Sequence, residues 1–107
     1  MKFSDANPGW KKSQSSLVDL ISLARAQSIR TIVIPYPLPW GLREQPYPFQ
    51  FYIDAVSRTA KAAGAECLDV TPILQDPSIR LTVGAVEPHP SAQVYARIAE
   101  ELEKMLR

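Results

Sequence analysis

Apolar residues recur at helical spacing in three segments of the chain. The first segment spans residues 13–27, where Ser16 and Asp19 resemble a capping box, so a helix is expected there. The second spans residues 49–63 and stops at Gly64, a residue type that commonly ends helices. The third begins after Ser91, a good N-cap residue, and its apolar stripe consists of Val94, Ile98, Leu102 and Met105.

Two short apolar runs between these helices predict strands. The first run, Thr31-Ile32-Val33-Ile34, is mostly β-branched and lacks polar alternation, as in strands of a parallel sheet that are covered on both faces. Residues 67–71 predict a second strand that ends at Pro72. The five prolines in residues 35–48 exclude regular structure there and predict a long surface loop, which is either functional or a stiffened connector.

The order of elements is helix, strand, helix, strand, helix. Strands that alternate with helices predict right-handed crossovers and a parallel sheet, so the expected class is α/β, a three-layer α/β/α sandwich in one domain over residues 1–107. Two strands are too few to hide the edges of their own sheet, and an open apolar edge invites pairing. We therefore expect half of a larger fold, and a homo-oligomer rather than a monomer.

Composition excludes several classes of function. The chain has 107 residues with a net charge of +1 and no block of like charge, which argues against binding of nucleic acid. No apolar stretch approaches the roughly 20 residues that span a bilayer, and residues 1–5 lack the apolar core of a signal peptide. The expectation is a cytoplasmic chain with no membrane span.

The cysteine and glycine content limits the kinds of binding site and cross-link that the chain can contain. The single cysteine, Cys67, excludes an internal disulfide and a cysteine-rich metal site, and its apolar neighbours predict a buried structural thiol. No glycine-rich loop follows either predicted strand, which argues against a nucleotide-binding domain. No cofactor or metal is expected.

The only histidine, His89, is the main candidate for catalysis. It opens the run His89-Pro90-Ser91 directly before the last helix, where a side chain is held by the fold yet open to solvent. Such a position suits a general base, although an isolated histidine near a helix start is often only a polar surface residue.

The order of elements and the sequence His89-Pro90-Ser91-Ala92 resemble the C-terminal half of the SGNH/GDSL hydrolases, flavodoxin-like enzymes that cleave esters and thioesters. The similarity is greatest to the lysophospholipase and arylesterase-like members and extends from about residue 7 to residue 106. In that family the last block reads Asp-x-x-His followed by Pro and Asn or Ser. The resemblance implies that His89 is the base and that a small ester is the substrate.

The chain departs from the family at the histidine's partner. The family's carboxylate stands three residues before the histidine, and here that position is Val86. Glu87 is the nearest upstream carboxylate, followed by Asp76, and Glu87 could orient the imidazole only if the loop bends suitably. A solvated loop carboxylate is the alternative interpretation of Glu87.

The family's serine block is missing. No Gly-Asp-Ser run occurs in the chain, and a base without a nucleophile does not attack an ester. Asn7 stands near the place of the family's oxyanion-hole Asn, or it belongs to a plain N-terminal segment. Two functions therefore remain: the His-bearing portion of an SGNH-type acyl hydrolase that is inactive alone, and a non-catalytic α/β module that dimerises through its open sheet edge.

Overall fold

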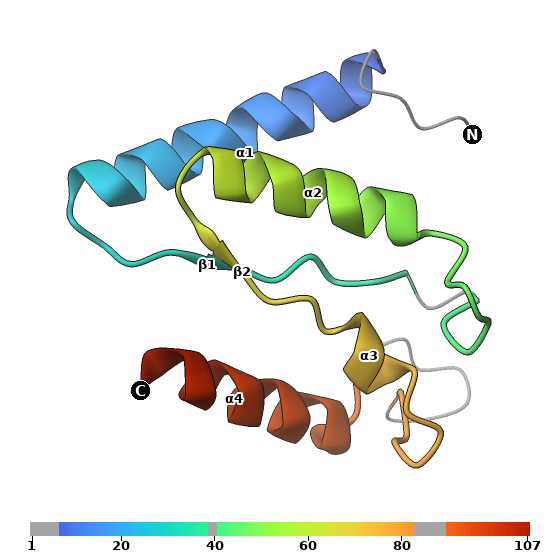
Figure 1. The fold of residues 1–107 in the computed structure, drawn as a ribbon. Coiled ribbons are helices and arrows are strands. Elements are labelled where there is room, and N and C mark those ends of the chain that lie inside the picture. The colour runs from blue at the N-terminus through green and yellow to red at the C-terminus, as the bar shows by residue number, and fades with distance from the viewer. Residues whose placement is uncertain (1–6, 39–40, 83–89) are drawn as a thin grey trace.

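The computed structural model describes residues 7–38, 41–82 and 90–107. It is a mixed α/β structure with this order of elements: α1 (Pro8–Ala26), β1 (Ile32–Val33), α2 (Gln50–Ala62), β2 (Glu66–Cys67), α3 (Thr71–Leu74) and α4 (Ala92–Leu106). Figure 1 shows α1 and α2 side by side on one side of the strands, with α4 on the other side.

The two strands pair in parallel, as the alternation of helices and strands predicts. Ile32 is in register with Glu66, and Val33 with Cys67. The amides of Glu66 and Leu68 donate to the carbonyls of Thr31 and Val33 at 3.0 and 2.9 Å. The chain crosses from one strand to the next through α2, which is the crossover that a parallel pair requires.

Helix α1 begins five residues earlier than the periodic pattern predicts, and the expected capping box at Ser16 and Asp19 is wrong. The N-cap is Asn7, whose side-chain oxygen accepts a hydrogen bond from the amide of Trp10 at 3.1 Å. Pro8 follows at the first helical position, where its missing N–H is not needed. The start of α1 is therefore set by Asn7 and Pro8 together.

The strands are shorter and more exposed than the sequence suggests. Thr31, Ile32, Val33 and Ile34 are all only half-buried, so the expectation that this run is covered on both faces is wrong. The second predicted strand ends early, because Thr71 begins the short helix α3 instead of ending a strand. The Thr71 amide donates to the Asp69 carboxylate at 2.9 Å, which turns the chain into that helix.

The structure confirms two helix boundaries that the sequence predicts, the stop after α2 and the start of α4. Gly64 lies just after α2 with φ +99°, a backbone conformation that favours glycine. Ser91 is the N-cap of α4, and its hydroxyl oxygen accepts from the Val94 amide at 3.4 Å.

Within the part of the chain that the structure describes, the core consists of three hydrophobic clusters. The largest joins α3 and α4 to the loop before α2 and to Ile53 of α2, and its fully buried members are Ile53, Val70, Leu74 and Val94. The other two clusters lie where α1 packs on α2 and the strands, around Trp10 in one and Ile21 in the other. Helix α2 contributes to all three clusters through Ile53, Val56 and Ala60.

Cys67 is half-buried in β2, and its thiol lies 3.7 Å from the carbonyl oxygen of Ser57. Burial raises the pKa of the Cys67 thiol, which disfavours the nucleophilic thiolate. The sequence predicts a buried thiol, whereas Cys67 is only partly buried. None of the described helices combines the length and the apolar character that crossing a membrane requires.

Candidate functional site

The carboxyl ends of β1 and β2 lie at the same end of the structure as the amino ends of α1, α2 and α4 (Figure 1). This arrangement follows from the chain direction, because each long helix runs opposite to the strands. In open α/β sheets, ligands bind outside the carboxyl ends of the strands. The loop that follows β1 and the start of α4 both belong to this end.

Backbone hydrogen bonds join the start of α4 to the segment that follows α3. Thr82 and Pro90 form an isolated antiparallel bridge, and the Ser91 amide donates to the Leu81 carbonyl at 3.1 Å. The Ser91 hydroxyl also donates to the Arg80 carbonyl. Ser91 is only 5% exposed, so this hydroxyl is a buried structural group with two partners rather than a free nucleophile.

A hollow of about 490 Å³ lies at this helix start. Among the described residues it is lined by Arg80, Ser91, Ala92 and Gln93. The Gln93 side-chain oxygen accepts from the Arg80 amide at 2.7 Å, and the Arg80 guanidinium donates to the Thr82 carbonyl at 3.0 Å. The hollow has the size of a small-molecule site, and its wall is mainly apolar with the polar side chains of Arg80 and Gln93 beside it.

Arg80 and Gln93 were not predicted as site residues. Their hydrogen bond joins positions thirteen residues apart, and no local motif encodes it. Only the pairing of the segment after α3 with the start of α4 brings them together.

The two principal catalytic candidates, His89 and Glu87, lie outside the described residues. The described neighbour of His89 in sequence is Pro90, at the bridge beside the hollow. Asp76, the other carboxylate considered for His89, has partners of its own. Its Oδ1 accepts from the amide and hydroxyl of Ser78 at 2.9 and 2.8 Å, and its Oδ2 lies 3.8 Å from the Arg97 guanidinium.

These contacts favour the ionised form of the Asp76 carboxyl. Hydrogen bonds from Ser78, and to a lesser extent the nearby charge of Arg97, hold the pKa of the Asp76 carboxyl below its ordinary value. Asp76 is therefore a carboxylate fixed within its own turn and against α4.

Asn7, the candidate oxyanion donor, lies at the amino end of α1, on the same end of the structure as the start of α4 (Figure 1). Its Oδ1 is used by the Trp10 amide, which gives Asn7 a structural role as N-cap. The N-cap hydrogen bond uses only the Oδ1 atom of Asn7, so the N–H groups of its Nδ2 take no part in that contact.

A further group of polar side chains joins the start of α2 to the segment that follows β2. The Gln50 amide nitrogen lies 3.1 Å from Asp54 Oδ1 and 3.4 Å from Asp69 Oδ2. Asp69 also accepts from the Thr71 amide, so its carboxylate closes a turn as well as contacting α2. Among the described residues, no three His, Cys, Asp or Glu side chains come together as a metal site.

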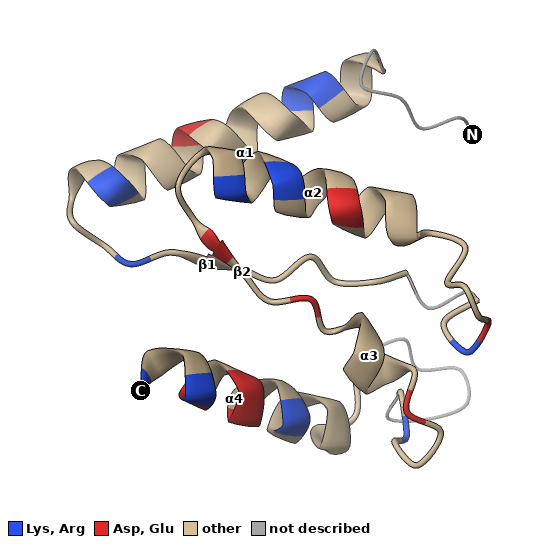
Figure 2. Cartoon of the chain, viewed as in Figure 1, with Lys and Arg blue, Asp and Glu red and all other residues tan. Residues whose placement is uncertain are grey.

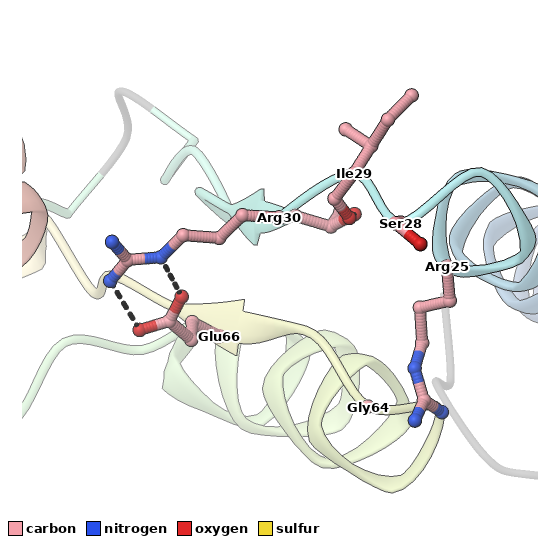
Figure 3. Close-up of a pocket in the computed structure, with 7 residues that line it drawn as sticks. Arg25, Ser28, Ile29, Arg30, Gly64 and Glu66 are labelled. Atoms are coloured by element: carbon pink, nitrogen blue, oxygen red, sulfur yellow. Dashed lines mark hydrogen bonds and ion pairs between the residues drawn. The ribbon is translucent and has the colours of Figure 1, made fainter.

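The opposite end of the strands holds a second hollow, of about 340 Å³ (Figure 3). Arg30 forms a forked ion pair there with Glu66, with N–O distances of 2.5 and 2.8 Å, and also donates to the Met105 carbonyl at 2.6 Å. The Arg25 guanidinium lies on the other side of this hollow, beside Gly64. These contacts tie the turn after α1 to β2 and α4.

Positive and negative residues are interspersed along the helices in Figure 2. Comparison with protein-family models, curated proteins and solved structures finds no match for this chain.

Proposed function

We propose that this chain carries the base-bearing C-terminal half of an SGNH-type acyl hydrolase, with His89 as general base. The observation that supports the proposal is the hollow at the start of α4, on the carboxyl side of a parallel β1–β2 pair and next to Pro90. In this proposal the complete enzyme has a three-layer, flavodoxin-like fold, and this chain supplies two strands of its sheet.

The proposed chemistry divides between this chain and a serine-bearing segment. His89 accepts the proton of the serine hydroxyl as that oxygen attacks the ester carbonyl, and then donates it to the leaving alcohol. Glu87 would hold the imidazole in the required tautomer. Asn7 could donate to the developing oxyanion through its Nδ2, because the helix cap uses only its Oδ1.

A chimera tests the proposal. The serine-bearing half of an SGNH hydrolase is joined ahead of Asn7, and hydrolysis of p-nitrophenyl esters is measured. We expect turnover that falls about 10²–10⁴-fold in His89→Ala, the range that a general base contributes. A smaller loss is expected for Glu87→Gln, since Val86 stands in the place of the family's usual partner.

The control is Ser22→Ala, a substitution on the exposed surface of α1 that should leave turnover unchanged. A folded chimera without activity, or one whose activity survives His89→Ala, would overturn the hydrolase proposal.

A second candidate function is a non-catalytic module that assembles through its sheet. One observation favours it: among the described residues, no strand pairs with the outer edge of β1. This candidate needs no serine nucleophile.

A further inference from the structure

The turn that leads from α1 to β1 is open to solvent along its whole length. Residues 25–30 are all exposed, and this is the longest exposed run in the part of the chain that the structure describes. The turn is closed by backbone hydrogen bonds, among them one from the Ser28 amide to the Arg25 carbonyl at 2.9 Å. Because helix ends open locally at little cost, an enzyme can engage this run without unfolding the core.

Ser28 lies at the tip of this turn. Its φ of +58° is a left-handed conformation that ends the helix. Ser28 lines the hollow at the amino end of the strands, on the same side as Arg25 and Gly64 (Figure 3). No described residue is hydrogen-bonded to the Ser28 hydroxyl. The hydroxyl is therefore exposed and not committed to a structural contact.

The residues around Ser28 form a pattern that protein kinases recognise. Leu23 stands five residues before Ser28, Arg25 three residues before it, and Ile29 directly after it. Leu23 and Ile29 are 63% and 57% exposed, although both are large apolar residues. An arginine-directed serine kinase reads such a segment with a carboxylate that pairs with the arginine and with apolar pockets for the residues on either side.

We propose that Ser28 is a phosphorylation site for an arginine-directed serine/threonine kinase. The Ser28 hydroxyl oxygen attacks the γ-phosphorus of the ATP that the kinase holds with Mg²⁺. The bond from that phosphorus to the bridging oxygen breaks, ADP leaves, and the hydroxyl proton passes to a carboxylate of the kinase. The inference does not depend on the hydrolase proposal, because neither His89 nor the hollow at the start of α4 takes part.

The structure distinguishes Ser28 from Ser15, the other serine that has a basic residue three positions earlier, Lys12. Ser15 lies within α1, where the helical hydrogen bonds hold the backbone on both sides of it. The residue five positions before it is Trp10, which is buried. A kinase would have to unwind the packed part of α1 to reach Ser15, so Ser15 serves as an internal control.

A phosphate on Ser28 would change the contact between α1 and α2. The Arg25 guanidinium donates to the Ala63 carbonyl at 3.1 Å and lies against Gly64. Phosphoserine carries a charge of about −1.5 to −2 at pH 7, and hydrogen bonds between two charged groups are stronger than those to a neutral carbonyl. Arg25 would therefore turn from Ala63 to the phosphate. The dipole of α1 also repels a negative charge at its carboxyl end, which loosens the last turn further.

The experiment treats the whole folded chain with Mg-ATP and a calmodulin-dependent protein kinase, an arginine-directed enzyme, and locates the phosphate by mass spectrometry. Wild type is expected to gain one phosphate, on Ser28, and Ser28→Ala none. Leu23→Ser should slow the reaction about tenfold, because an apolar contact with the kinase is lost. Ser22→Ala, which is exposed on α1 and lies outside the pattern, should react at the wild-type rate.

Circular dichroism checks that each variant is folded. A folded wild type that gains no phosphate, or gains it on Ser15, would overturn the inference. A rate that is unchanged in Leu23→Ser would also overturn it, and so would equal modification of Ser28 by a kinase that requires acidic residues near the serine.

A second measurement follows the consequence for Arg25. In the phosphorylated chain, the amide signals of Ala63 and Gly64 should shift in NMR spectra relative to the unmodified chain. Signals that stay in place after complete phosphorylation would show that Arg25 keeps its contact with Ala63, against the inference.

Discussion

The guanidinium of Arg25 occupies the space in which a side chain at Gly64 would begin. A Cβ atom at Gly64 would lie 2.6 Å from Arg25 Cζ and 2.8 Å from its Nε. The same guanidinium donates to the Ala63 carbonyl at 3.1 Å, so it covers the end of α2 (Figure 3). The contact between Arg25 of α1 and Gly64 therefore joins α1 to the end of α2.

Gly64→Ala should therefore destabilise the protein for two reasons. The positive φ of 99° is unfavourable for alanine, by about 1–2 kcal/mol. The new methyl group also displaces the flexible Arg25 guanidinium, which then loses its hydrogen bond to the Ala63 carbonyl. Urea unfolding of Gly64→Ala, Arg25→Ala and the double variant separates the two effects. We expect the effect of Gly64→Ala to be smaller in the Arg25→Ala background, and an equal effect in both backgrounds would contradict the steric part.

Asn7→Ala should lower the free energy of unfolding by about 1 kcal/mol, the usual loss when a helix loses its N-cap. Asn7→Ser keeps an acceptor for the Trp10 amide and should differ little from wild type. The control is Ser16→Ala, on the exposed face of α1, where no loss is expected. Thermal unfolding measures all three, and an unstable Asn7→Ser would show that Asn7 does more than cap the helix.

The stability should depend on pH through Glu66. The hydrogen bond from Arg30 holds the pKa of Glu66 below its ordinary value of 4.5. A carboxyl group whose pKa is lowered by folding stabilises the protein above its unfolded pKa, and this contribution disappears as the pH falls through the folded pKa. Wild type should therefore be more stable than Glu66→Gln above pH 4.5, and this difference in stability should disappear as the pH falls below that value.

Unfolding midpoints of wild type and Glu66→Gln over a pH series test this expectation. In an Arg30→Gln background, the change in stability caused by Glu66→Gln should become nearly independent of pH. A pH-dependent change that persists without Arg30 would assign the effect to another partner of Glu66.

Ser91→Ala removes a buried hydroxyl that both caps α4 and bonds to the Arg80 carbonyl. The expected loss of stability is about 1–2 kcal/mol, toward the upper end for N-cap substitutions. Ser22→Ala, which is exposed on α1, is the matched control and should be neutral. Calorimetry compares the two variants, and a neutral Ser91→Ala would mean that water replaces both contacts.

The three long helices could be predicted because their signals are local. The buried faces of α2 and α4 follow from apolar periodicity, and Gly64 and Ser91 act within one turn of the helix end that each one sets. The start of α1 and the whole of α3 were missed, although their signals are also local. Pro8 and Pro72 occupy the first turn of their helices, where a missing N–H is harmless, so proline next to an apolar run marks a start as well as a stop.

The site was less predictable, because its contacts join distant parts of the chain. Neither the Arg80–Gln93 hydrogen bond nor the Thr82–Pro90 bridge has a sequence signature. The partial exposure of Ile32 and Ile34 depends on which neighbours the sheet has, and a single strand's composition does not determine that. The roles of His89 and Glu87 stay predictions, since both lie outside the described residues.

The contribution of α2 to all three hydrophobic clusters has a consequence for how the native state opens. Helix α1 is held by the clusters around Trp10 and Ile21, whereas α4 is held by the cluster on the other side of the strands. Each outer helix can therefore detach while the opposite side stays packed, as a separate cooperative unit. Amide hydrogen exchange should be slowest in α2, and α1 and α4 should each exchange through their own partial unfolding.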